Sequence, residues 1–275
     1  MTLRLGPANR QLRQGLLLSL VIIGLALAGP WLAPHTPSEL VGPAYGEPTW
    51  QAPLGFDYLG HDVLSRVLAG GWSVVWMALA ASLLALLVGT VLGLLASQSR
   101  GPLERLIVWS ADVSLAFPEL ILVLLVVSLL GREPWLIVLT VAFAFLPGVI
   151  RLTRASAQAI AGQAFVEVLR AMGLPQRHIL LREILPNLLT ALLVHVGNML
   201  TWAIAILSGL SFLGYGVAPP AADWGLMISE NQGGLMIQPW AVLAPTLLIA
   251  LFAYASNLLA EGLGRIRAGI AEQSS

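Results

Sequence analysis

Lysine and cysteine are both absent from this sequence of 275 residues, so all 14 basic residues are arginines. Without cysteine the chain can form no disulfide and no thiolate metal site. Without lysine it cannot contain the phosphate-binding loop G-x-x-x-x-G-K-[ST]. If ATP drives this protein, another chain must bind the nucleotide and its Mg²⁺ and hydrolyse it. We therefore expect no cofactor in this chain and no enzymatic activity.

Charge is scarce as well. Charged residues make up 10% of the chain, against about 25% in soluble domains. Hydrophobic residues make up 57%, and mean hydropathy is +0.84. The net charge is zero and no long basic run is present, which argues against a nucleic-acid partner. The four histidines show no HExxH or paired-ligand spacing, so no metal site is predicted. The predicted solvent is membrane lipid.

Six apolar runs are long enough to cross about 30 Å of hydrocarbon as helices. They span residues 13–33, 73–97, 106–131, 134–151, 188–210 and 241–262. The fourth is the shortest, because Pro134 and Pro147 bound it. The sequence predicts an all-α integral membrane protein with six transmembrane helices. Residues 1–72 would hold the first helix and an outer loop, and residues 73–275 a core of five helices.

The placement of the arginines predicts the orientation. With the N-terminus in the cytoplasm, 12 of the 14 arginines fall inside and only Arg66 and Arg132 fall outside, as the positive-inside rule requires. Both termini would then be cytoplasmic. We predict that the first helix is retained, although Ala26-Leu27-Ala28 could also end a cleavable signal peptide. Cleavage would leave the remaining topology unchanged.

In this topology residues 152–187 form the largest cytoplasmic loop, and they are unusually charged for this chain. Residues 154–172 are predicted to be helical, with Phe165, Leu169 and Met172 forming one apolar stripe. Gly173 suits the left-handed position that closes a helix, and Pro175 suits the start of the next one. This second, short helix is predicted to end before Pro186. Such an element could dock on a partner protein or lie on lipid headgroups.

The loop resembles the EAA loop of bacterial ABC importer permeases, whose pattern is E-A-A, three residues, G, nine residues, I-x-L-P. The matching positions are Glu167, Gly173, Leu185 and Pro186, while the two alanines and the isoleucine are replaced. Four further stretches are similar to segments of the dipeptide/oligopeptide/nickel permease family, C-type subunit. They are LGFDYLGHDVLSR (54–66), ADVSLAFPEL (111–120), LSFLGYGVAPPAADWGLMI (210–228) and a degraded NLLAEGLGR (257–265).

The resemblance implies the type I ABC importer permease fold in a bacterial inner membrane. It implies a heterodimer with a homologous B-type permease, two ABC ATPase subunits and an extracytoplasmic substrate-binding protein. Substrates would be di- or oligopeptides, or nickel and other metal-chelate complexes. Coupling to the ATPases would lie in the EAA loop (about 152–187), at Glu167, Arg170, Ala171, Gly173, Leu174, Pro175, Leu185 and Pro186.

Two other groups of residues are candidate sites. Asp112, Pro118 and Glu119 could line the translocation path. Glu119, which departs from the family's small or neutral residue, should face the bundle interior, because a carboxylate is costly in lipid. It could act there by bonding a neighbouring helix or by favouring a cationic substrate. The signature at 210–228 could shape the outer mouth or receive the binding protein, or it could only fold a tight loop. Its candidate residues are Gly214, Gly216, Pro219, Pro220, Trp224 and Gly225.

Two rival functions are less well supported. A serine protease within the membrane would need a nucleophile hydrogen-bonded to a base, but Ser208 and His195 lie near opposite ends of one predicted span. A secondary transporter or channel subunit not coupled to ATP remains the alternative. Such carriers usually have paired half-repeats, and none is evident in the sequence. A neighbouring gene for a P-loop ATPase would distinguish the two.

Overall fold

The computed structural model describes residues 7–99 and 101–273, with side chains described between Arg10 and Arg265. These residues are helical apart from turns, loops and two isolated β-bridges. Five helices are long and apolar enough to cross a membrane. They are α1 (Pro7–Leu32), α2 (Val63–Gln98), α5 (Pro134–Ala161), α8 (Leu185–Phe212) and α10 (Trp240–Gln273). A bent pair, α3 (Pro102–Ser114) and α4 (Glu119–Leu130), raises the number of candidate spans to six.

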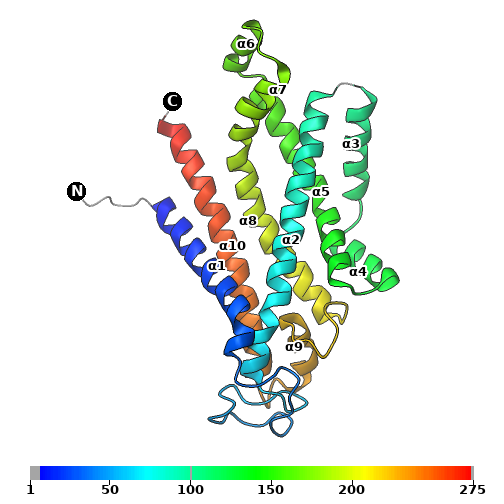
Figure 1. Ribbon diagram of the computed structural model, residues 1–275, viewed down its shortest axis with the longest axis vertical. Helices are drawn as coiled ribbons and strands as arrows, with labels where there is room; N and C mark the ends of the chain where they lie inside the picture. Colours follow the sequence, from blue (N-terminus) through cyan, green and yellow to red (C-terminus); the bar gives the residue numbers. More distant parts are fainter. Residues whose placement is uncertain (1–6, 100, 274–275) are drawn as a thin grey trace, which may run out of the picture.

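The short elements lie at the two ends of the bundle. At one end, α6 (Ala164–Ala171) and α7 (Gln176–His178) connect α5 to α8 through a π-helical segment, η1 (Ile179–Ile184). At the other end lie the loop 33–62, α9 (Trp224–Asn231) and the 3-10 turn η2 (Gln232–Gly234). Figure 1 shows that α1 begins and α10 ends toward the end that carries α6. The all-α membrane fold is thus confirmed, while the compartment that each end faces stays a prediction.

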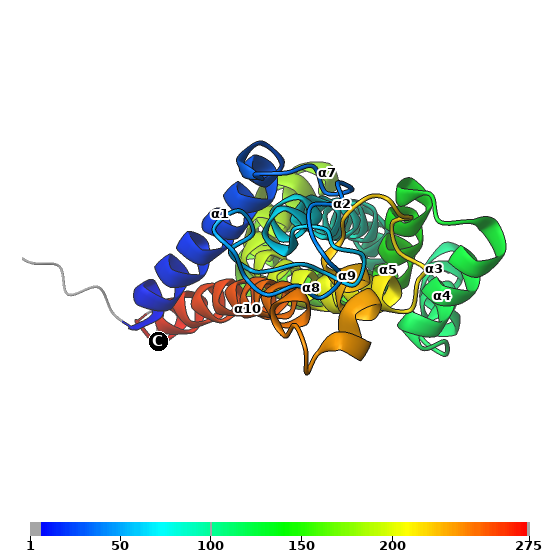
Figure 2. The same cartoon turned by 90° about the horizontal axis from the view of Figure 1, so that it is seen from below.

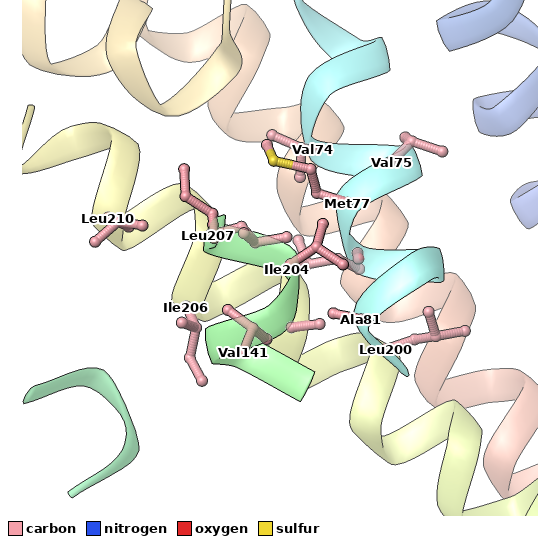
Figure 3. Close-up of a cluster of buried hydrophobic side chains, with 14 of the residues drawn as sticks. Val74, Val75, Met77, Ala81, Val141, Leu200, Ile204, Ile206, Leu207 and Leu210 are labelled. Atoms are coloured by element: carbon pink, nitrogen blue, oxygen red, sulfur yellow. The ribbon is translucent and has the colours of Figure 1, made fainter. Parts of the chain in front are cut away.

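Helix α2 lies at the centre of the bundle. Viewed along the bundle in Figure 2, α1 and α10 lie on one side of it and α3 and α4 on the other. Its buried side chains Val74, Met77 and Ala81 belong to the same core as Val141 of α5 and Leu207 of α8 (Figure 3). Burial of such apolar side chains within the bundle supplies dispersion contacts, which drive helix association in lipid.

Small residues let α2 approach α5 closely. A Cβ atom built on Gly89 would lie 2.6 Å from Val149 Cβ, and one built on Gly93 would lie 2.6 Å from Thr153 Cβ. Both distances are shorter than real Cβ contacts, so only glycine fits here. The two glycines are four residues apart on one helix face. The G-x-x-x-G spacing in α2 therefore fixes its contact with α5.

In three spans, exposed tryptophans mark the end that lies away from α6, which is the end predicted to be outer. Trp31 lies at the end of α1, and Trp135 and Trp240 lie at the starts of α5 and α10. All three side chains are exposed and belong to helix ends next to the outer loops. Tryptophan is enriched at membrane–water interfaces. Their position is typical of an aromatic belt at one face of the bilayer.

The third predicted span differs most from expectation. Residues 106–131 do not form one continuous helix: α3 and α4 meet at 86° across the break 115–118. Pro118 explains the break, because proline disfavours helical geometry in the residue before it and has no N–H to donate. Glu119 consequently lies in the first turn of α4. The fourth span is instead longer than predicted and continues through Pro147 to Ala161.

The loop 152–187 also differs in detail. The predicted helix over 154–172 is interrupted at Gly162 and Gln163, which separate the end of α5 from α6. The short helix predicted to end before Pro186 runs on into α8. The physical reason is the π-helical turn: Leu185 N–H bonds to Leu180 C=O, five residues back. This wider turn, with Pro186 in the first turn of α8, lets the proline ring enter without breaking the helix.

Candidate functional site

Helix α6 is held on the bundle by an apolar base. Val166 is fully buried, and Leu169 and Leu174 are partly buried beside it. They pack into one cluster with residues of four other elements, namely Leu94 of α2, Ala157 and Ile160 of α5, Ile179 and Ile184 of η1, and Leu188 and Leu192 of α8. A short helix gains its stability from such packing rather than from propensity. Movement of α6 would therefore be transmitted to these helices.

The outward face of α6 carries a different apolar stripe from the one predicted. Phe165, Val168 and Met172 are exposed, at spacing i, i+3 and i+7. Leu169 was predicted to be part of the exposed stripe, and that was wrong. It lies three residues after the buried Val166 and therefore shares the inner face of the helix. Helix α6, which carries this exposed stripe, projects from the end of the molecule (Figure 1).

Gly173 closes α6 with a Schellman motif. Its φ is +79°, in the left-handed region that disfavours other residues. Its N–H bonds to Arg170 C=O at 3.0 Å, and Leu174 N–H bonds to Leu169 C=O at 3.2 Å. Leu169 and Leu174 also share the apolar cluster, which is the hydrophobic contact that accompanies this motif. Gly173 thus turns the chain so that Leu174 can reach the base.

The other predicted coupling residues lie around this turn. Glu167, Arg170 and Ala171 are exposed on α6. Pro175 is extended and caps α7, where His178 N–H bonds to its C=O at 2.9 Å. Gln176 donates its side-chain amide to Gln98 of α2. Two more residues continue the connection, Leu185 partly buried against the base and Pro186 exposed at the start of α8. The structure therefore brings all eight together at one end.

Asp112, predicted as a path residue, is engaged by an arginine. Its carboxylate accepts a hydrogen bond from Arg151 Nε of α5 at 3.1 Å and pairs with the same guanidinium. Two turns closer to the end of the bundle that carries α6, Glu104 of α3 forms an ion pair with Arg154 of α5. These two ion pairs connect α3 to α5. Asp112 therefore has a structural partner and does not offer a free charge.

Glu119 and Pro118 lie at the break between α3 and α4. Pro118 is the residue that caps α4, and Glu119 begins it. The Glu119 side chain lines a cleft of about 610 Å³ between α4, α5, α8 and α10. Four further polar side chains, those of His195, Asn198, Thr201 and Asn257, line the same cleft. A carboxylate in the first turn of a helix interacts favourably with the helix dipole. Sequence reasoning found Glu119 but missed its polar neighbours.

The motif at 54–66 builds a buried ion network at the outer end. The guanidinium of Arg66 donates to the Asp57 carboxylate and lies 2.9 Å from Glu230 of α9. His61 donates its backbone N–H to Asp57 at 2.9 Å, and its ring Nδ1 lies 2.9 Å from the same carboxylate. Burial by itself raises the pKa of Asp57, but hydrogen bonds from Arg66 and His61 outweigh it and hold that pKa below its ordinary value of 3.8.

This network joins segments far apart in sequence. Tyr58 N–H donates to Asn231 Oδ1 at 3.0 Å, and Tyr58 Oη donates to Glu230 at 3.3 Å. Burial beside Glu230 raises the pKa of Tyr58. The loop 33–62 is therefore fastened to α9. The sequence offered a signal in the charged residues of the motif, but it did not indicate that their partner lies in α9.

The signature at 210–228 divides into buried and exposed members. Trp224 is fully buried and donates Nε1–H to Val67 C=O at 2.8 Å. Gly225 and Gly216 are buried against α8, where a Cβ on Gly225 would lie 2.4 Å from Ser208 C=O. Gly214, with φ +82°, and the pair Pro219 and Pro220 are exposed. Of the six candidate residues in this signature, these three are the exposed ones.

Asp223 organises the same corner, although it was not predicted as a site residue. It caps α9 by accepting from the N–H groups of Gly225 and Leu226, at 2.9 and 3.1 Å. Ser73 of α2 donates to its other oxygen at 2.6 Å. Burial raises the pKa of Asp223, although these hydrogen bonds oppose the rise. The capped helix and the buried Trp224 hold α9 against α2.

Comparison with known proteins identifies the relatives of this chain. A family model described as "Binding-protein-dependent transport system inner membrane component" matches residues 89–266. The Di/tripeptide transport system permease protein DppC of Pseudomonas aeruginosa is 35% identical over 266 residues, covering 93% of this chain and 86% of that protein. The Glutathione transport system permease protein GsiD of Pectobacterium atrosepticum is 35% identical over 210 residues, covering 76% and 70%.

A solved structure supports the fold. An inward-facing conformation of the MetNI methionine ABC transporter matches with a TM-score of 0.55 at 16% identity, covering 72% of this chain and 96% of the matched chain. At this identity the likeness concerns the fold alone, and it confirms the expected type I ABC importer permease fold. The family match, the relatives and the helices that can span a membrane lead to one conclusion. This chain belongs to the family of inner membrane components of binding-protein-dependent transport systems, as a multi-pass permease.

Proposed function

We propose that this chain is the C-type permease subunit of an ABC importer that carries short peptides into the cytoplasm. The relatives named above are permeases for di/tripeptides and glutathione, which favours peptides over nickel or other metal complexes as the substrate. In this proposal the chain pairs with a homologous B-type permease. A binding protein delivers peptide to the outer end, which includes the exposed Gly214, Pro219 and Pro220.

Two ABC ATPase subunits complete the proposed assembly, and they bind the ATP and Mg²⁺. The observation that carries this part is the exposed stripe of Phe165, Val168 and Met172 on a helix whose inner face is locked into the bundle. An apolar stripe on a projecting helix is a surface that a groove in a partner can bury. Because α6 shares one cluster with α2, α5, η1 and α8, movement of the ATPases would shift these helices together.

Uptake by the reconstituted assembly tests the function. The complex of two permeases and two ATPases is placed in proteoliposomes with ATP on the side of α6 and the peptide-loaded binding protein on the other. We expect uptake of a labelled dipeptide that requires both ATP and the binding protein. Uptake that persists without ATP would instead favour a secondary transporter or a channel.

The orientation can be tested separately, because the chain contains no cysteine. A single cysteine replaces Gln176, which is exposed on α7, or Glu47, which is exposed in the loop 33–62. A membrane-impermeant maleimide added to intact cells, with the outer membrane opened, should label Glu47→Cys and leave Gln176→Cys unlabelled until the inner membrane is lysed. The reverse pattern would overturn the proposed orientation.

A further inference from the structure

The cleft at the break between α3 and α4 is polar although apolar spans surround it. Glu119, His195, Asn198 and Asn257 line it, together with the aromatic side chains of Phe145 and Trp202. A fifth polar side chain of the cleft, Thr201, donates to the backbone C=O groups of Gly197 and Ala253. Among the described residues, no side-chain hydrogen bond or ion pair involves the other four. The cleft therefore contains both hydrogen-bonding capacity and a carboxylate that the described part of the chain leaves unused.

The cleft lies midway along the bundle and opens at its side, where Asn198, Trp202 and Asn257 are exposed. Gly148 lies 14 residues from the start of α5 and borders the cleft, where a Cβ on it would lie 3.7 Å from His195 Nε2. His195 lies 10 residues into α8. At 1.5 Å per residue these positions are about 15–20 Å from the helix ends. A polar cleft at this depth is where a transported molecule, rather than bulk water at either surface, would meet these side chains.

The negative charge of Glu119 is not compensated inside the described chain. No arginine lines the cleft. The arginine one turn beyond Gly148 on α5, Arg151, is neutralised by Asp112, and Arg154 is neutralised by Glu104. An ionisable side chain within a membrane protein is costly unless it faces a partner or a water-filled path. The Glu119 carboxylate is therefore available to bind a cation that is not part of this chain.

We propose that Glu119 is a charge-selecting residue of this cleft, which binds the side-chain ammonium or guanidinium group of a passing peptide and favours cationic over neutral and anionic substrates. A positive group beside Glu119 gains a charge-assisted hydrogen bond, and the face of Trp202 adds a cation–π contact. The amides of Asn198 and Asn257 can pair with the C=O and N–H groups of the peptide backbone. This inference rests on the proposed function and specifies its substrate class.

The test compares uptake of three labelled dipeptides by the full transporter in proteoliposomes, with its ATPases and binding protein. The dipeptides are Ala-Arg, Ala-Ala and Ala-Glu. Because the binding protein is the same in each sample, its own preference cancels when the uptake ratio of a variant is divided by that of the wild type. Glu119→Gln should lower the ratio of Ala-Arg to Ala-Ala uptake about five- to ten-fold and raise the ratio of Ala-Glu to Ala-Ala.

Two further variants serve as controls for the loss of charge in Glu119→Gln. Glu133→Gln removes the same charge from an exposed position in the α4–α5 loop, outside the cleft, and should leave both ratios unchanged. Glu119→Asp keeps the charge and should retain most of the preference for Ala-Arg. Wild-type ratios in Glu119→Gln would overturn the proposal. So would equal loss of all three peptides, or loss of the partner permease on purification, because either indicates a structural role. Absence of ATP-dependent uptake by the wild type would contradict the proposed function itself and remove this inference with it.

Discussion

Replacing Val168 with Asp should release the ATPase subunits from the permease while leaving the permease folded. Val168 is 57% exposed on α6 and lies at the centre of the stripe formed with Phe165 and Met172. A carboxylate buried there without a partner costs several kcal/mol, and about 3 kcal/mol corresponds to roughly a hundredfold loss of affinity. The measurement is binding of purified ATPase to the detergent-solubilised permease, together with peptide-stimulated ATPase activity of the complex.

Two comparisons make this result specific. Val168→Leu keeps the surface apolar and should bind the ATPases with nearly wild-type affinity. Val166→Ala, in contrast, removes buried atoms from the base of α6 and should lower the melting temperature of the isolated permease, which Val168→Asp should not do. If Val168→Asp binds the ATPases as well as the wild type, α6 is not the docking element, and the alternative of a helix lying on headgroups is favoured.

Replacing Arg66 with Met should destabilise the outer end by about 3–5 kcal/mol, the cost of breaking a buried ion pair from one side. Arg66 is 4% exposed, and the substitution removes the guanidinium from both carboxylates. Asp57 then keeps only His61 as a side-chain partner, and Glu230 keeps only the Tyr58 hydroxyl. Helix α2 has 36 residues, or about 54 Å at 1.5 Å per residue, well beyond the ~30 Å of hydrocarbon. Part of α2 therefore extends beyond the lipid, and Arg66 lies in its first turn.

Thermal unfolding and limited proteolysis of the loop 33–62 measure this effect. Arg105→Met removes an exposed arginine of α3 and should change neither result. The double substitution Arg66→Met with Asp57→Asn should recover part of the loss, because it removes the unpaired charge as well. If Arg66→Met melts with the wild type and its loop resists protease equally, the network does not hold the loop.

The pH dependence distinguishes the ion pair from simple packing. The pKa of folded Asp57 is below 3.8, so its contribution to stability is fully present above pH 3.8 and is lost as the pH falls through the lower, folded pKa. Arg66→Met removes a main cause of that depression. The acid-induced loss of the loop should therefore begin at a higher pH in this variant than in the wild type.

The membrane spans and the turn that ends α6 could be predicted from sequence because both are local. A transmembrane helix requires only a long apolar run, which any window along the chain reveals. The left-handed residue that ends α6 requires a glycine, and Gly173 stands at that point with φ +79°. The family resemblance rested on the same kind of local motif, and the comparisons confirmed it.

Tertiary structure alone decided which side of each element faces inward and which charges meet. The stripe on α6 was misassigned because Leu169 is drawn inward by Leu94 and Ile179, which belong to other helices. The break at Pro118 became an 86° bend because α3 packs along α5 through the pairs Asp112–Arg151 and Glu104–Arg154.

The pairing of residues far apart in the sequence also depends on the tertiary structure. Arg66 meets Glu230, and Glu119 shares a cleft with His195 and Asn257, although no local pattern relates these positions. Apolar periodicity predicts that a helix crosses the membrane, but lipid is apolar on every side and imposes no preferred rotation on it. The rotation is determined by close packing, such as that of Gly89 against Val149, and by polar groups that must find partners. Those partners are brought within reach only when the helices are assembled.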